Sequence, residues 1–349
     1  MSESSRGVES DATTFRSIDP VEVGHEPNEA HEEPVSPVAA LPSARRRPTP
    51  HISKLRELLN NPKVPESDHK NVHAAIARYE AWISAMAELQ SVGDEKVSDL
   101  VRLLNDYKRS IELELIWDSS SDFLFRQRGQ LKIDNSIIEE FLPWLVDVAI
   151  IPELADDDLF AGPASAYAAT YFSTTIAAAV PSLGMRLRTK DQDFTISRQA
   201  YLRASFDASF ASRKTESATL WLAYVAAECK TNLDKTMFQE ASATSHDLKV
   251  AMPGARYYLI CEYLDMTPIS TSGTDIDEVL ILRGKRLASN KRSAYSSADN
   301  RVRLRDEYVA YLDANPIRVD IVLRFVEHLR SLFQHKDPDE NDAVLKGYF

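Results

Sequence analysis

One stretch of the 349-residue chain, from Thr219 to Lys230, limits the possible folds more than any other. Its first part, up to Ala227, has no charged residue and is rich in aromatic and aliphatic side chains. This composition favours a strand buried on both faces over a helix, although periodicity alone does not distinguish the two. Side chains alternate along a strand, so Glu228 and Lys230 share one side and Cys229 faces the other. Burying charges at the end of such a strand costs free energy unless they pair with each other or hold a ligand. This stretch alone leaves open both an ion pair and a ligand site.

Asp207 shifts the balance towards a ligand site. The phenylalanines of a predicted strand over residues 201–210 fall on one face, and Asp207 falls on the other. The polar residues 211–217 predict a turn into the next strand. If the two strands form a hairpin, Asp207 comes level with Glu228. Two close carboxylates make a site for a hard divalent cation such as Mg²⁺, and a neighbouring lysine can orient a water or offset charge on a phosphate.

An aspartate followed about twenty residues later by Glu-x-Lys at the end of an apolar strand resembles the active-site motif of the PD-(D/E)XK nuclease superfamily. Here the motif is Asp207 with Glu228-Cys-Lys230, and Phe206 stands in place of the usual proline. The resemblance implies a Mg²⁺ site formed by Asp207, Glu228 and the Cys229 carbonyl. It also implies that the same two acids are catalytic together with Lys230, which would orient or activate the attacking water.

Asp191 and Asp193 are rivals of Asp207 for the first metal ligand. They lie 37 and 35 residues before Glu228, a longer spacing than the motif usually has. The spacing favours Asp207 and leaves both rivals open.

Residues 227–240 and 257–266 resemble type II restriction endonucleases of the Bpu-ten-I family, and the resemblance is clear over roughly residues 190–285. It implies an α/β fold in which a PD-(D/E)XK restriction-endonuclease-like core, a mixed sheet flanked by helices, follows an all-helical region. The implied function is Mg²⁺-dependent hydrolysis of phosphodiester bonds in double-stranded DNA at a short asymmetric site. The implied partners are a second, non-identical nuclease subunit or a second copy in a homodimer, and a cognate DNA methyltransferase as genetic partner.

Composition and periodicity divide the chain into four parts. They are a disordered acidic tail, a helical region, a nuclease core, and a basic segment with a C-terminal helix: residues 1–50, 51–182, 183–285 and 286–349. The tail has too few large apolar residues to offset the entropy of ordering it. The helical region includes a predicted buried helix from Ala164 to Val180, and the closing helix is predicted from Arg318 to Phe333.

The net charge of −12 at pH 7 is weak evidence against a DNA partner. Residues 1–44 hold nine acidic residues and two arginines, a net of −7, which leaves −5 for the rest. Between Arg283 and Arg305, eight basic residues stand against one acid, Asp299. This segment favours contacts with DNA phosphates, although a solvated basic loop has the same composition. The predicted DNA-binding residues are Arg283, Lys285, Arg286, Lys291 and Arg292.

Other functional classes find little support in the sequence. The chain has no Gly-x-Ser-x-Gly elbow and no phosphate-binding glycine motif, and the spacing of its two cysteines predicts core residues. No signal peptide or membrane-spanning stretch is visible, so a cytoplasmic protein without a membrane partner is expected. Two alternatives to a nuclease remain: a catalytically silent DNA-binding module with a nuclease-like fold, and a helical interaction protein with an acidic tail.

Overall fold

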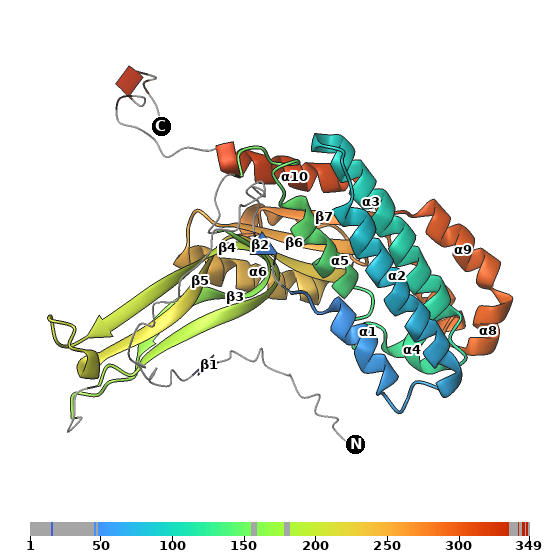
Figure 1. Ribbon diagram of the computed structural model, residues 1–349, viewed down its shortest axis with the longest axis horizontal. Coiled ribbons are helices and arrows are strands. Elements are labelled where there is room, and N and C mark those ends of the chain that lie inside the picture. The colour runs from blue at the N-terminus through green and yellow to red at the C-terminus, as the bar shows by residue number, and fades with distance from the viewer. Residues whose placement is uncertain are drawn as a thin grey trace, which may run out of the picture.

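The computed structural model describes residues 15–16, 45–46, 48–154, 159–177, 182–334, 341, 344–345 and 347. Within these residues a mixed, seven-stranded sheet lies against helices (Figure 1). The strands are β1 (Phe15–Arg16), β2 (Arg45–Arg46), β3 (Phe160–Phe172), β4 (Met185–Ser205), β5 (Thr215–Leu233), β6 (Arg256–Leu264) and β7 (Glu278–Lys285). Their order is β1-β4-β3-β5-β6-β7, with β2 paired to β3. This arrangement confirms the predicted α/β class.

The helices come in two groups along the chain. Those before the main strands are α1 (His51–Leu59), α2 (His69–Ala87), α3 (Gly93–Ser110), α4 (Asp122–Gln127) and α5 (Ser136–Phe141). Those that follow β5 are α6 (Lys235–Ala251), α7 (Ser289–Ala294), α8 (Ala298–Arg303), α9 (Arg305–Ala314) and α10 (Val319–Gln334). In α3, Leu100, Val101 and Leu104 recur at helical spacing and are fully buried, so the helix forms by packing one apolar stripe on its neighbours.

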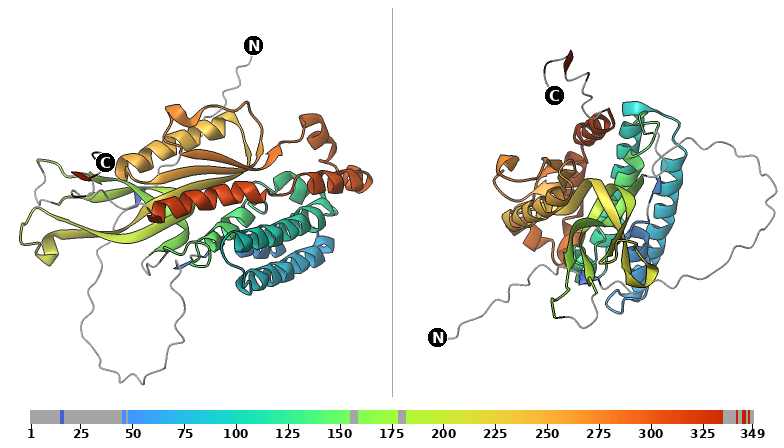
Figure 2. Two further views of the ribbon diagram at one scale, coloured as in Figure 1. Left: turned by 90° about the horizontal axis from the view of Figure 1, so that it is seen from above. Right: turned by 90° about the vertical axis from the view of Figure 1, so that its left-hand side faces the viewer.

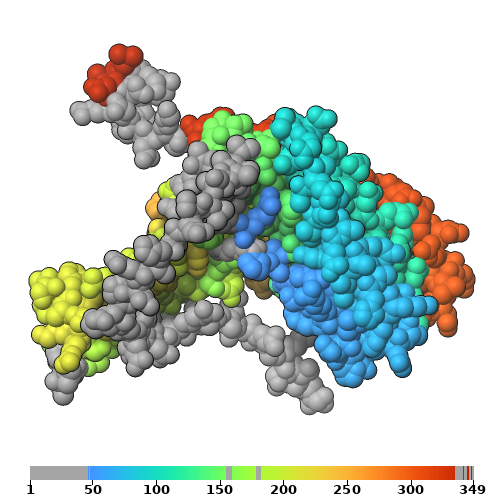
Figure 3. Space-filling view, viewed as in Figure 1, coloured from blue at the N-terminus to red at the C-terminus, as the bar shows by residue number. Residues whose placement is uncertain are grey.

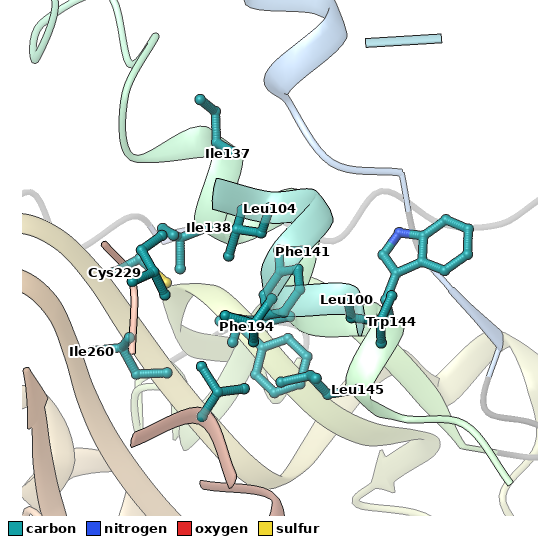
Figure 4. Close-up of a cluster of buried hydrophobic side chains, with 14 of the residues drawn as sticks. Leu100, Leu104, Ile137, Ile138, Phe141, Trp144, Leu145, Phe194, Cys229 and Ile260 are labelled. Carbon is teal, nitrogen blue, oxygen red and sulfur yellow. The ribbon is translucent and has the colours of Figure 1, made fainter. Parts of the chain in front are cut away.

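The sheet has an antiparallel half and a parallel half. β4 pairs antiparallel with both β3 and β5, whereas β5, β6 and β7 run parallel, with α6 as the crossover between β5 and β6. Helix α6 packs Phe238 and Leu248 on one face of the sheet (Figure 2). The larger core lies on the other face, where Phe194, Cys229 and Ile260 meet residues of α3 and α5 (Figure 4). Both cysteines are free and buried, as predicted.

Several predicted elements are confirmed. The apolar run that ends at Lys230 is strand β5, and it forms a hairpin with β4. The amphipathic segment after it is α6, and the closing helix is α10. None of the described helices is long and apolar enough to cross a membrane.

The predicted helix from Ala164 to Val180 is wrong. Its first part belongs to strand β3, which ends at Phe172, and residues 178–180 lie outside the described residues. Alanine is depleted in strands, so the many alanines of this segment give no clear strand signal, and pairing with β4 decides the conformation instead. Strand β3 therefore places part of the sheet inside the region, residues 51–182, that was predicted to be helical. The prediction of disorder for residues 1–50 falls almost entirely outside the described residues.

Parts of β3, β4 and β5 extend beyond the helical body as an arm (Figures 1 and 3). Within it, β4 pairs with β3 over residues 185–197 and with β5 over residues 194–205. Glu216 lies opposite Ala204 near the end of β4, and its carboxylate accepts a 2.9 Å hydrogen bond from the Gly184 N–H, just before β4 begins. The two ends of β4 therefore lie close together near the tip of the arm, and the middle of β4 lies at the base.

Candidate active site

Asp207 lies at the tip of the arm rather than beside Glu228. Strand β4 ends at Ser205, which pairs with Thr215 at the beginning of β5, so Asp207 falls in the turn between them. Its carboxylate accepts hydrogen bonds from the Ser209 backbone N–H (3.0 Å) and hydroxyl (2.8 Å). Glu228 lies on the order of 40 Å farther along β5, at about 3.3 Å per residue. The predicted convergence of Asp207 with Glu228 is therefore wrong, because the hairpin is longer than the sequence pattern indicated.

Asp193, one of the two rivals, takes that place. Phe194 pairs with Ala227 in the antiparallel ladder. Asp193, the residue before Phe194 on β4, is therefore level with Glu228, the residue after Ala227 on β5. A carboxylate oxygen of Asp193 accepts a 2.9 Å hydrogen bond from the Cys229 backbone N–H. The base of the arm thus holds the pair Asp193 and Glu228 in place of the predicted pair Asp207 and Glu228.

A β-bulge sets the direction of Asp193. Asp193 and Phe194 on β4 stand opposite Pro163 alone on β3, which is one residue more than regular pairing has. Bulges re-aim side chains and are frequent beside active sites. Asp191, the other rival, pairs opposite Ser165, is exposed, and accepts a hydrogen bond from the Ser165 hydroxyl. Asp191 is therefore engaged with β3 rather than with Glu228.

Glu228 is held through both of its carboxylate oxygens. The Lys230 ammonium lies 2.5 Å from Oε1. The Tyr257 hydroxyl donates a 3.1 Å hydrogen bond to Oε2. Burial alone would lower the pKa of Lys230, but the charges of Glu228 and Asp193 raise it above its ordinary value, so the amine is protonated at neutral pH. Glu228 and Lys230 share one side of β5, as strand alternation predicted.

Glu139 and Lys132 also belong to this site, although neither was predicted. Glu139 on α5 is 2 % exposed, and burial, followed by the charge of Asp193, raises its pKa to about 7. The Lys132 ammonium lies 3.5 Å from Asp193 and 3.6 Å from Glu139. Its backbone has φ 53°, a left-handed conformation that is uncommon for a residue other than glycine. The sequence signal for Glu139 was a pair of acids, with Glu140, inside the otherwise apolar residues 137–145.

The available ligands suit an oxygen-preferring cation. The pKa of Tyr257 lies well above its ordinary value. Burial raises it most, and the negative charges of Glu228 and Asp193 raise it further. The Cys229 thiol is packed in the core and 2 % exposed, so only the Cys229 carbonyl is a candidate ligand. Among the described residues, no group of three or more His, Cys, Asp or Glu side chains is arranged to hold a metal. Two carboxylates and a carbonyl, completed by water, match the preference of Mg²⁺.

The predicted DNA contacts divide into two kinds. Arg283 is only 7 % exposed and forms ion pairs with Glu112 (3.2 Å) and Glu262 (3.2 Å), so its prediction as a DNA contact is wrong. Its positive charge balances acids in the interior instead. The other four lie at least partly exposed on the surface: Lys285, Arg286, Lys291 and Arg292.

Comparison with known proteins shows the fold and the family. No curated protein matches the sequence. A solved structure described as "native BbvCI A2B2 tetramer at low resolution" shares the fold, with a TM-score of 0.56 and 19 % identity over 82 % of this chain and 98 % of that chain. The family described as Bpu10I restriction endonuclease matches residues 130–349, more than half of the sequence. The chain therefore belongs to the Bpu10I restriction endonuclease family and is a nuclease.

Proposed function

We propose that this protein is a type II restriction endonuclease that hydrolyses phosphodiester bonds in double-stranded DNA with Mg²⁺. The observation that carries the proposal is the meeting of Asp193, Glu228 and Lys230 at the base of the arm, in a chain of the restriction endonuclease family. The three residues are the aspartate and the Glu-x-Lys of the motif, with Asp193 in the position first given to Asp207.

Each residue has a chemical task in this proposal. Asp193, Glu228 and the Cys229 carbonyl would hold the cation. When bound, a divalent cation would neutralise phosphate charge and lower the pKa of a water. Lys230, protonated and next to Glu228, donates hydrogen bonds that orient the attacking water and offset the charge that develops on the phosphate. Glu139 and Lys132 complete the charge balance around Asp193.

The surface residues Lys285, Arg286, Lys291 and Arg292 are the proposed contacts with the DNA backbone. Lys285 is exposed, and Lys291 forms a surface ion pair with Glu307 that phosphate can replace. Neutralising phosphates releases counterions, so these contacts contribute affinity without sequence preference.

We further propose that the protein cuts a short asymmetric site with a second, non-identical subunit, and that a DNA methyltransferase protects the host. The similar BbvCI structure is described as an A2B2 tetramer, an assembly of two kinds of chain, which supports a heteromeric assembly here.

Cleavage of plasmid DNA tests the proposal. The purified chain is incubated with plasmid, alone and with extract of its host strain, in Mg²⁺ or in EDTA, and extract alone serves as the control. We expect discrete fragments in Mg²⁺ and none in EDTA. DNA binding without any cutting in all four mixtures would instead support a catalytically silent binding module.

A further inference from the structure

Tyr257 is a buried residue that touches the candidate site and that the motif does not include. It lies on β6, opposite Ala226 of β5, and is 1 % exposed. Its hydroxyl donates to Oε2 of Glu228 at 3.1 Å, while Lys230 occupies Oε1 at 2.5 Å. The two carboxylate oxygens of Glu228 therefore have different partners. Oε2 contacts the hydroxyl of a buried tyrosine, and Oε1 contacts the ammonium of a lysine whose side chain is 27 % exposed.

The position of the Tyr257 hydroxyl is fixed from two sides. Its ring packs in the core beneath α6 with Phe238. Its backbone N–H donates a 2.7 Å hydrogen bond to Asp277, which also forms an ion pair with Lys249 at 2.7 Å.

We propose that Tyr257 is a positioning residue for the nuclease reaction: its hydroxyl holds Oε2 of Glu228 so that Oε1 is the oxygen presented to a divalent cation. Lys230, which contacts Oε1, then lies on the side of the carboxylate that faces the cation. Hydrogen bonds from outside the ligand set orient ligating carboxylates, and their loss typically weakens metal binding by about 10- to 100-fold. The inference rests on the proposed function, because it assumes that Glu228 is a cation ligand.

The chain provides a matched pair of variants. Tyr257→Phe removes only the hydroxyl, and phenylalanine fills the same space in the core. Tyr258→Phe makes the same change one residue along β6, on the opposite face, where Tyr258 packs against Phe325. Because Glu228 is 22 % exposed at its side chain, water can replace the lost partner, and we expect Tyr257→Phe to fold.

Titration calorimetry with Mn²⁺ alone measures the effect on the full-length chain. We expect Tyr257→Phe to bind Mn²⁺ about 10- to 100-fold more weakly than the unaltered protein, and Tyr258→Phe to bind equally well. In cleavage, Tyr257→Phe should need more Mg²⁺ and recover at saturating Mg²⁺, a rescue that a purely structural defect would not show. Equal Mn²⁺ affinity in the two variants would overturn the role of Tyr257 alone. Absence of Mn²⁺ binding by the unaltered protein would overturn the cation site itself, and the proposed function with it.

Discussion

At the scale of single residues, Glu139 shows how strongly the site perturbs an acid. Its carboxyl group is 2 % exposed, and Oε1 forms an ion pair with the Lys132 ammonium at 3.6 Å. Burial and the nearby charge of Asp193 disfavour the ionised form, which is why its pKa is raised from 4.5 to about 7. The Lys132 ammonium also lies 3.5 Å from Asp193, so its charge partly offsets the repulsion between the two acids.

We expect Glu139→Gln to remove a pH dependence of stability. Between about pH 4.5 and 7, Glu139 binds a proton in the folded protein but not in the unfolded chain. Its contribution to the free energy of unfolding is therefore complete below pH 4.5 and is lost as the pH rises through 7. In EDTA at about pH 8, Glu139→Gln should be more stable than the unaltered protein, by up to ~3 kcal/mol, with little difference at about pH 4. Urea denaturation at both pH values measures this. Parallel stability curves for the two proteins would contradict the assigned environment of Glu139.

At the scale of elements, the sequence predicted those whose pattern is local. The apolar run of β5 and the amphipathic stripe of α6 follow from composition and period, and both are confirmed. Strand β3 was missed because its alanines give no local strand signal, and pairing with β4 decides its conformation. Glu228 and Lys230 could be found because they are close in sequence. Asp193 could not be chosen over Asp207, because the choice depends on the hairpin register and a bulge, which only the paired strands define.

A buried ion network joins the helical elements to the parallel strands. Lys108 of α3 is fully buried and lies 3.0 Å from Glu262 of β6. Arg283 of β7 contacts the same acid and Glu112, each at 3.2 Å. Removing one member of a buried pair leaves an uncompensated charge in the interior.

We expect Arg283→Met to lower the free energy of unfolding by about 3–5 kcal/mol. Arg286→Met is the matched control, because Arg286 pairs with Asp265 near the surface and should cost less than about 1 kcal/mol. Urea denaturation gives both values, and filter binding at low salt should show weaker DNA binding for Arg286→Met only. Similar small losses of stability in the two variants would show that Arg283 is not a structural residue.

At the scale of the whole molecule, the candidate site combines parts of the chain that were assigned to separate regions. Glu139 comes from α5, Asp193 from β4, Glu228 and Lys230 from β5, and Tyr257 from β6. The helical region therefore contributes to the candidate site as well as packing against the sheet. The overall charge of −12 does not describe this site, where two lysines lie against three acids.

Asp193, at the base of the arm, is the acid that joins Glu228, and the candidate site depends on it most. The most direct measurement compares Asp193→Ala with Asp207→Ala in Mg²⁺-dependent plasmid cleavage, under the conditions in which the unaltered protein cuts. We expect Asp193→Ala to lose more than about a hundredfold in rate, as for loss of a group that stabilises transition-state charge. Asp207→Ala should cut at the rate of the unaltered protein. Full activity of Asp193→Ala, with activity lost in Asp207→Ala, would contradict the site described here.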